Sequence, residues 1–223
     1  LCSAQRMLSD DKIAPFAIGA DGFSPGDGAG AVVLTRFEDA AATDQEIYGL
    51  ICGTGSSSDA VSFTAPDSKG QQTAICRALA DAGAHPASIG YVETHGTGTQ
   101  RGDATEIAAL NAGYEAARNG PLCLGSAKAN FGHTFAAAGM LGLIKAITAV
   151  RTGIVPPILM RRSINPNLPT QTLPMDLPEN PTPWPIDGPR LAAVNSMGTG
   201  GTNFHVLVKE PPMQSHIQET SCS

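Results

Sequence analysis

Apolar positions along the chain recur at spacings that predict alternating strands and helices. The short apolar runs that are typical of buried strands are 29–34, 46–55, 89–94 and 122–126. From Gln71, apolar residues at helical spacing predict a helix that ends at Gly83, with Pro86 just beyond it. Because strands and helices alternate in the middle of the chain, we expect an α/β protein with a mostly parallel sheet and helices on its faces.

Two further helices are expected after the third and fourth strands. Asp103 is predicted to be an N-cap, with Glu106 at capping-box spacing, and the helix that it opens runs to about Arg118. The segment 136–150 is apolar almost all round, which predicts a buried helix. Lys145 interrupts this segment, which we judge too short to span a bilayer.

The last third of the chain combines an irregular segment with a hairpin. Residues 156–189 are rich in proline and show little periodicity, as expected of a segment tied to a site or an interface. The runs 191–196 and 204–208 predict two strands that a glycine-rich turn joins into a hairpin. The tail after Pro212 is expected to be disordered.

Composition and charge narrow the functional class. Of the 223 residues 42% are hydrophobic, which is ample for a core, and the formal net charge of −6 argues against a nucleic-acid or membrane partner. The five cysteines lack CxxC and metal-ligand spacing, so we expect reduced thiols, no metal site and a cytoplasmic protein. They are Cys2, Cys52, Cys76, Cys123 and Cys222. None has the setting of a nucleophile: Cys52 and Cys123 fall in predicted strands, and Cys76 is placed on the packed side of its helix.

Two histidines follow the carboxyl ends of predicted strands. His95 opens a His-Gly-Thr-Gly-Thr turn after 89–94, and His133 closes the loop that starts at Lys128 after 122–126. Ligands gather at the carboxyl ends of parallel strands, so the two rings could converge on a site. The alternatives are that His95 only ties its loop down and that His133 caps the following helix.

The setting of His133 favours a neutral ring. It precedes the apolar helix by about one turn, and the positive end of that helix disfavours imidazolium. A neutral imidazole can donate one hydrogen bond to a developing enolate or alkoxide. Lys128 either orients this loop or is a solvated surface charge.

The turn 198–203 is not a dinucleotide-binding fingerprint. A strand follows it instead of a helix, and the GxGxxG spacing fails. It is either a plain hairpin turn or a set of backbone N–H donors that face a thioester oxygen.

Four segments in this order resemble the C-terminal half of the β-ketoacyl synthase (ketosynthase) family, in its polyketide synthase branch. They are Ala20–Gly30, Tyr91–Asp103, Gly125–Gly139 and Gly200–Asn203. The resemblance implies a thiolase-like, layered α-β-α-β-α fold built from two similar halves. On this basis residues 1–55 are a connecting segment with strands from the end of the N-terminal half, 56–210 are the C-terminal half, and 211–223 are a flexible tail.

The resemblance also implies a reaction, the decarboxylative Claisen condensation of fatty acid and polyketide biosynthesis. A cysteine carries the acyl chain, and a malonyl-type extender arrives on the 4′-phosphopantetheine of an acyl carrier protein, with no bound cofactor. By position, His95 and His133 match the catalytic histidines that hold the malonyl thioester oxygen, and Lys128 matches the lysine that supports them.

Further roles follow from the same resemblance. Thr97 and Thr99 match the hydroxyls that bind the phosphopantetheine arm, and the backbone N–H of Thr199 matches an oxyanion-hole donor. Met197, Gly198 and Thr199 lie where relatives form an acyl gate, and Met197 replaces a common phenylalanine. Asp27 stands in a Gly-Asp-Gly where Gly-Glu-Gly is usual.

The nucleophilic cysteine of the family is not in this chain. We therefore expect an acyltransferase that is active only with a Cys-bearing N-terminal half, supplied by another chain or segment, and that forms a dimer of complete ketosynthase units. The alternatives are a non-elongating partner, such as a chain-length factor or acyl-transfer scaffold, and a thiolase. Both histidines are present, which argues against the non-elongating partner.

Overall fold

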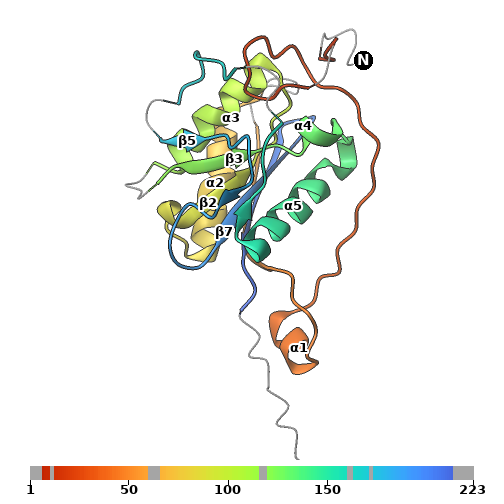
Figure 1. The fold of residues 1–223 in the computed structure, drawn as a ribbon, viewed down its shortest axis with the longest axis vertical. Coiled ribbons are helices and arrows are strands. Elements are labelled where there is room, and N and C mark those ends of the chain that lie inside the picture. The colour runs from red at the N-terminus through yellow and green to blue at the C-terminus, as the bar shows by residue number, and fades with distance from the viewer. Residues whose placement is uncertain are drawn as a thin grey trace, which may run out of the picture.

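A computed structural model describes residues 7–10, 13–59, 66–115, 120–159, 163–170 and 173–212. Its centre is a six-stranded sheet in the order β1-β8-β7-β2-β3-β5 (Figure 1). Strands β1 (Leu50–Ser58), β8 (Thr202–Lys209) and β7 (Leu191–Gly198) pair antiparallel, whereas β7, β2 (Ile89–Glu93), β3 (Leu122–Gly125) and β5 (Met175–Asp176) run parallel. The parallel centre and the C-terminal hairpin are both as predicted.

Alternating strand residues bury the two faces of the sheet in separate cores. Val92 and Leu124 pack in one core with residues of α2 (Ser68–Ala82) and α3 (Gln100–Gly113). Their neighbours Tyr91 and Cys123 pack in the other core, with the inward face of α5 (Ala138–Thr152). Successive side chains of a strand point to opposite faces, so the sheet lies between α2 and α3 on one side and α5 on the other.

The carboxyl ends of β2 and β3 lie side by side because the strands are parallel neighbours in register from Tyr91–Cys123 to Glu93–Gly125. The loop after β2 leads into α3, and the loop after β3 contains the short helix α4 (Lys128–Phe131) and the 3-10 turn η2 (Phe135–Ala137). This edge of the sheet therefore receives the segments of both candidate histidines.

The N-terminal segment corrects a prediction. Residues 29–34 form no strand, and they run as an extended arm toward the short helix α1 (Phe37–Ala42), clear of the sheet (Figure 1). Val33 and Leu34 are 94% and 73% exposed. An apolar run forms a strand only where a neighbour accepts its backbone hydrogen bonds, and no strand of the described residues lies beside this one.

Predictions for two helices also need correction. Helix α3 begins at Gln100, after Thr99, so Asp103 lies inside its first turn and is not the N-cap. The helix ends at Gly113, short of Arg118, which lies outside the described residues. Helix α2 ends as expected, at Gly83 in the left-handed conformation, but Cys76 is exposed and not on the packed side.

Helix α5 is only half covered, contrary to the expectation of full burial. Its buried residues are Gly142, Ala146, Ala149 and Val150, while Ile144 is exposed. Together with η2 it forms an 18-residue segment of mean hydropathy 1.3, so length and composition alone would permit a membrane span, against our expectation. Its contacts here are with β7 and β2, as in the core helix of an α/β protein.

In the described part of the proline-rich segment 156–189, the strands are β5 and β6 (Thr182–Pro183), and the rest is irregular. Strand β6 pairs with β4 (Ile154–Val155), which lies just before the segment. The tail beyond Pro212 lies outside the described residues, as do Cys2 and Cys222.

Candidate active site

The two candidate histidines meet at the carboxyl edge of the sheet. The ring centroids of His95 and His133 lie 5.7 Å apart, with the ring planes at 86°. Phe23 and Phe135 pack against the His133 ring, each with its centroid 5.0 Å away. Residues far apart in the sequence thus form one site with an aromatic wall.

Backbone donors fix which nitrogen of each ring carries the proton. The N–H of Met197 donates to Nδ1 of His95 at 3.4 Å, and the N–H of Phe135 donates to Nδ1 of His133 at 3.0 Å. A nitrogen that accepts a hydrogen bond is unprotonated, so each neutral ring carries its proton on Nε2. Both histidines therefore present one N–H donor from Nε2.

The surroundings keep both rings neutral at pH 7. Burial lowers the pKa of His95 well below its usual value, and the charge of Lys128 lowers it further. Burial and then Lys128 lower the pKa of His133 to about 4. We expected a neutral His133, but from a helix dipole; α5 begins only at Ala138, beyond η2, and the causes are burial and a buried cation.

A buried carboxylate holds the His95 turn. Glu106 accepts the backbone N–H groups of His95 at 2.7 Å and Gly96 at 2.9 Å, and the side-chain amide of Asn195 at 2.7 Å. Burial raises the pKa of Glu106 although these hydrogen bonds oppose the change. A Cβ on Gly96, whose φ is +39°, would lie 2.7 Å from Thr94 Oγ1, so the turn requires glycine.

A second buried carboxylate, that of Asp103, binds the turn after His95 through the N–H of Gly98. Its carboxylate accepts the N–H of Phe16 at 2.6 Å and the N–H of Gly98 at 3.1 Å. Burial raises its pKa to about 7. Asp103 and Glu106 thus satisfy backbone donors of loops instead of forming the predicted capping box.

Lys128 is buried, which excludes the interpretation as a solvated surface charge in this structure. Burial lowers its pKa, while the nearby carboxylates of Glu93 and Glu106 raise it. Glu93 accepts Tyr91 Oη–H and the N–H of Ala127, both at 2.5 Å, and pairs with Lys145 at 2.9 Å. Buried charged side chains of both signs therefore lie next to the two histidine loops, and Glu93 holds the loop after β3 through the N–H of Ala127.

Sequence reasoning missed this support. In the sequence analysis Glu93 is one residue of the segment Tyr91–Asp103 and has no role assigned to it. Lys145 is noted only because it interrupts the apolar segment 136–150. The available signal was that each is a lone charge in an apolar element, where a partner of opposite sign is expected.

The remaining predicted site residues lie around these rings. The hydroxyls of Thr97 and Thr99 are 3.1 Å apart in the turn after His95. Met197 touches His95 through its backbone, while Gly198 and Thr199 are exposed at the tip of the β7–β8 hairpin. Asp27 lies on the extended segment that passes the His133 loop.

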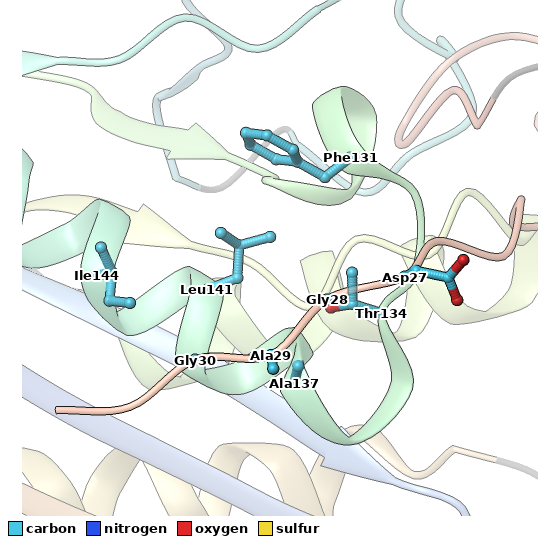
Figure 2. A pocket seen from close by; sticks show the side chains of 9 residues that line it. All are labelled: Asp27, Gly28, Ala29, Gly30, Phe131, Thr134, Ala137, Leu141 and Ile144. Carbon is cyan, nitrogen blue, oxygen red and sulfur yellow. The ribbon is translucent and has the colours of Figure 1, made fainter.

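An apolar cavity of about 160 Å³ opens beside the His133 loop, between residues 27–30 and α5 (Figure 2). Figure 2 shows Phe131 of α4 on one side and Leu141 and Ile144 of α5 on another, with Asp27 directed away. The hydroxyl of Thr134 is buried there without a hydrogen-bond partner among the described residues.

The described thiols lie outside the histidine loops: Cys52 in β1, Cys76 in α2 and Cys123 in β3. Burial raises the pKa of Cys52, which disfavours the thiolate. Within the described residues no group of three or more His, Cys, Asp or Glu side chains could hold a metal ion.

Comparison with known proteins identifies this arrangement. Residues 48–161 match the beta-ketoacyl synthase C-terminal domain, and residues 1–40 match the beta-ketoacyl synthase N-terminal domain. The chain belongs to the β-ketoacyl synthase family. The resemblance found in the sequence is thereby confirmed, and within the family the chain is of the polyketide synthase type.

Curated relatives of this chain are much longer proteins. The phthioceranic/hydroxyphthioceranic acid synthase of Mycobacterium tuberculosis is 40% identical over 227 aligned positions, which cover 98% of this chain and 11% of that protein. Erythronolide synthase EryA2 of Saccharopolyspora erythraea is 38% identical over 98% of this chain and 6% of its own length. The chain therefore spans only a small part of the length of these relatives.

Solved ketosynthase structures share the fold. The ketosynthase from module 6 of the bacillaene synthase of Bacillus subtilis 168 is 38% identical, with a TM-score of 0.89 over 95% of this chain and 39% of that one. The oxazolomycin ketosynthase domain of Streptomyces albus JA3453 is 33% identical, with a TM-score of 0.89 over 96% and 39%. The fold is thiolase-like, as predicted, and this chain supplies mainly its C-terminal half.

Proposed function

We propose that this chain supplies the histidine half of a β-ketoacyl synthase site for decarboxylative condensation. The observation that carries the proposal is the pair of neutral imidazoles, 5.7 Å apart, with both Nδ1 atoms engaged by backbone donors. A carbonyl oxygen has two lone pairs, so in this proposal one thioester oxygen accepts both Nε2–H groups. Family membership favours this chemistry over that of a thiolase.

The two donors suit the step in which charge develops. When a malonyl thioester loses CO2, the electrons of the broken carbon–carbon bond move onto the thioester carbonyl oxygen as an enolate. Hydrogen bonds from His95 and His133 to that oxygen stabilise the enolate more than the uncharged carbonyl. Each preorganised donor of this kind contributes about 3–4 kcal/mol to transition-state stability.

The second step needs a residue from outside the described site. The enolate carbon attacks the carbonyl of an acyl-cysteine, the new carbon–carbon bond forms, and the cysteine leaves as a thiolate. We propose that the thiol comes from the N-terminal half of a ketosynthase, in another chain or segment. Thr97 and Thr99 would hold the phosphopantetheine arm of an acyl carrier protein.

Reconstitution tests the proposal. The chain is combined with a Cys-bearing ketosynthase N-terminal half, an acyl thioester and a malonyl carrier protein, and the product is measured by mass spectrometry. We expect His95→Ala and His133→Ala each to lower condensation at least about a hundredfold. His85→Ala is the matched control, because His85 is exposed and its ring accepts only the N–H of Ala87 among the described contacts.

Unchanged product formation in the His95 and His133 variants would refute the catalytic assignment. A wild-type complex that binds the carrier protein but forms no product would instead favour a non-elongating partner.

A further inference from the structure

A buried chain of hydrogen bonds runs from the core to the His95 turn. Tyr114 Oη lies 2.6 Å from His205 Nε2, His205 Nδ1 lies 2.5 Å from Asn195 Oδ1, and Asn195 Nδ2 lies 2.7 Å from Glu106 Oε1. All four side chains are at least nine-tenths buried. The chain joins α3, β8 and β7 and ends on the carboxylate that holds the backbone of His95.

Each link in this chain has one direction. Glu106 Oε1 already accepts the His95 N–H, so it faces the amide nitrogen of Asn195, which donates. The amide oxygen of Asn195 therefore faces His205, whose Nδ1 must carry the proton. His205 Nε2 is then the acceptor, and Tyr114 donates its hydroxyl proton to it.

We propose that His205 is a positioning residue for His95, which acts by fixing the side-chain amide of Asn195; this inference rests on the proposed function. Glu106 sets which way that amide faces, because a turned amide would place Oδ1 of Asn195 against its carboxylate. The Nδ1–H of His205 then holds the amide oxygen in that orientation. Without the Nδ1–H of His205, only Glu106 holds the Asn195 amide, so the hydrogen bond from Asn195 to Glu106 weakens. The hold of Glu106 on the N–H groups of His95 and Gly96 then weakens with it.

Two substitutions separate the two nitrogens of His205. The side-chain amide of His205→Asn lies where Nδ1 lies and can still donate to Asn195. The side-chain amide of His205→Gln reaches the position of Nε2 and can still accept from Tyr114, but leaves no donor at Nδ1. Each variant removes one of the two hydrogen bonds, so a merely structural role predicts the same result for both.

Amide hydrogen exchange of the full chain, followed by NMR, distinguishes these cases. We expect His205→Gln to speed exchange at the N–H groups of His95 and Gly96 about tenfold relative to a β3 core amide, the factor expected for one lost buried hydrogen bond. His205→Asn should restore most of the protection. Equal acceleration in both variants, or acceleration in neither, would overturn the positioning role.

Activity in the reconstituted complex provides the second readout. We expect His205→Gln to lower kcat with little change in KM, and His205→Asn to recover part of the loss. Equal kcat values for the two variants in an active complex would contradict the proposal. If the wild-type complex does not condense while the exchange pattern holds, the proposed function fails and the link from His205 to His95 stands.

Discussion

At the scale of single residues, the site depends on protons held in fixed places. His95 and His133 carry theirs on Nε2 because backbone donors engage Nδ1, and His205 carries its own on Nδ1 because Asn195 presents an oxygen. Burial favours the neutral form of all three rings. The neutral rings of His95 and His133 therefore offer N–H donors whose position on the ring the surrounding hydrogen bonds determine.

A substitution at Glu106 should disturb this arrangement. Glu106→Gln keeps the size of the side chain but offers one acceptor atom where the carboxylate offers two. An N–H of the amide then faces a backbone N–H of His95 or Gly96. We expect a loss of about 2 kcal/mol in the free energy of unfolding and a large loss of condensation. Urea unfolding measures the first, and a stability equal to that of the wild type would contradict the described role.

The pKa of His205 predicts how stability depends on pH. Burial lowers it to about 3, far below about 6.5 in an unfolded chain. Between these two pKa values the unfolded state binds more protons than the folded state. The contribution of His205 to the free energy of unfolding is therefore fully present above the unfolded pKa and is lost as the pH falls. Relative to His205→Asn, the wild type should lose about 1.6 kcal/mol between pH 6.5 and 5.

Urea unfolding of both proteins at the two pH values tests this expectation. The comparison cancels groups that the proteins share, including Asp103, whose raised pKa acts in the opposite direction. The same pH dependence in both proteins would show that His205 is not held neutral.

At the scale of elements, the local pattern was sufficient where neighbours in sequence decide the structure. The turn chemistry of Gly83 identified the end of α2, and the two apolar runs 191–196 and 204–208 around a glycine-rich turn identified the hairpin. The pattern failed where a distant partner decides: 29–34 has no neighbouring strand among the described residues, and Asp103 bonds Phe16 instead of capping its own helix. The convergence of His95 and His133 could be predicted because parallel neighbouring strands end at one edge.

The close approach of β1 to α2 at Gly55 can be tested by substitution. A Cβ on Gly55 would overlap the backbone oxygen of Ala74, whereas a Cβ on Gly83 would meet nothing within 4 Å and only strain a left-handed φ of +57°. We expect Gly55→Ala to lower stability by more than about 2 kcal/mol and Gly83→Ala by about 1 kcal/mol. Denaturant unfolding should rank the two in this order, and the reverse order would contradict the packing.

At the scale of the whole molecule, apolar surface is left exposed to solvent. Large apolar side chains stay exposed on the extended arm, around the His133 loop and on α5: Val33, Leu34, Phe131, Phe135 and Ile144. The chain covers only 39% of the solved ketosynthase chains. We infer that the rest of a ketosynthase unit covers this surface. The sequence resemblance led to the same expectation, but only the structure shows which residues are exposed.

Exposed apolar surface predicts behaviour in solution. The chain by itself should associate with increasing concentration, and a Cys-bearing N-terminal half should replace that association with a defined complex. Sedimentation velocity measures both states. Leu34→Lys with Ile144→Lys should reduce self-association. Thr73→Lys with Ala80→Lys, on the exposed side of α2, is the control for two added positive charges. A soluble monomer that ignores the N-terminal half would contradict the paired arrangement.

The most direct test of the central claim is the ¹⁵N NMR spectrum of the imidazole rings of His95 and His133 at pH 7. We expect two neutral rings, each protonated at Nε2 with Nδ1 unprotonated, and no titration of His133 until the pH approaches about 4. Protonation at Nδ1 in either ring, or a charged ring at neutral pH, would contradict the claim that both histidines offer neutral donors to one thioester oxygen.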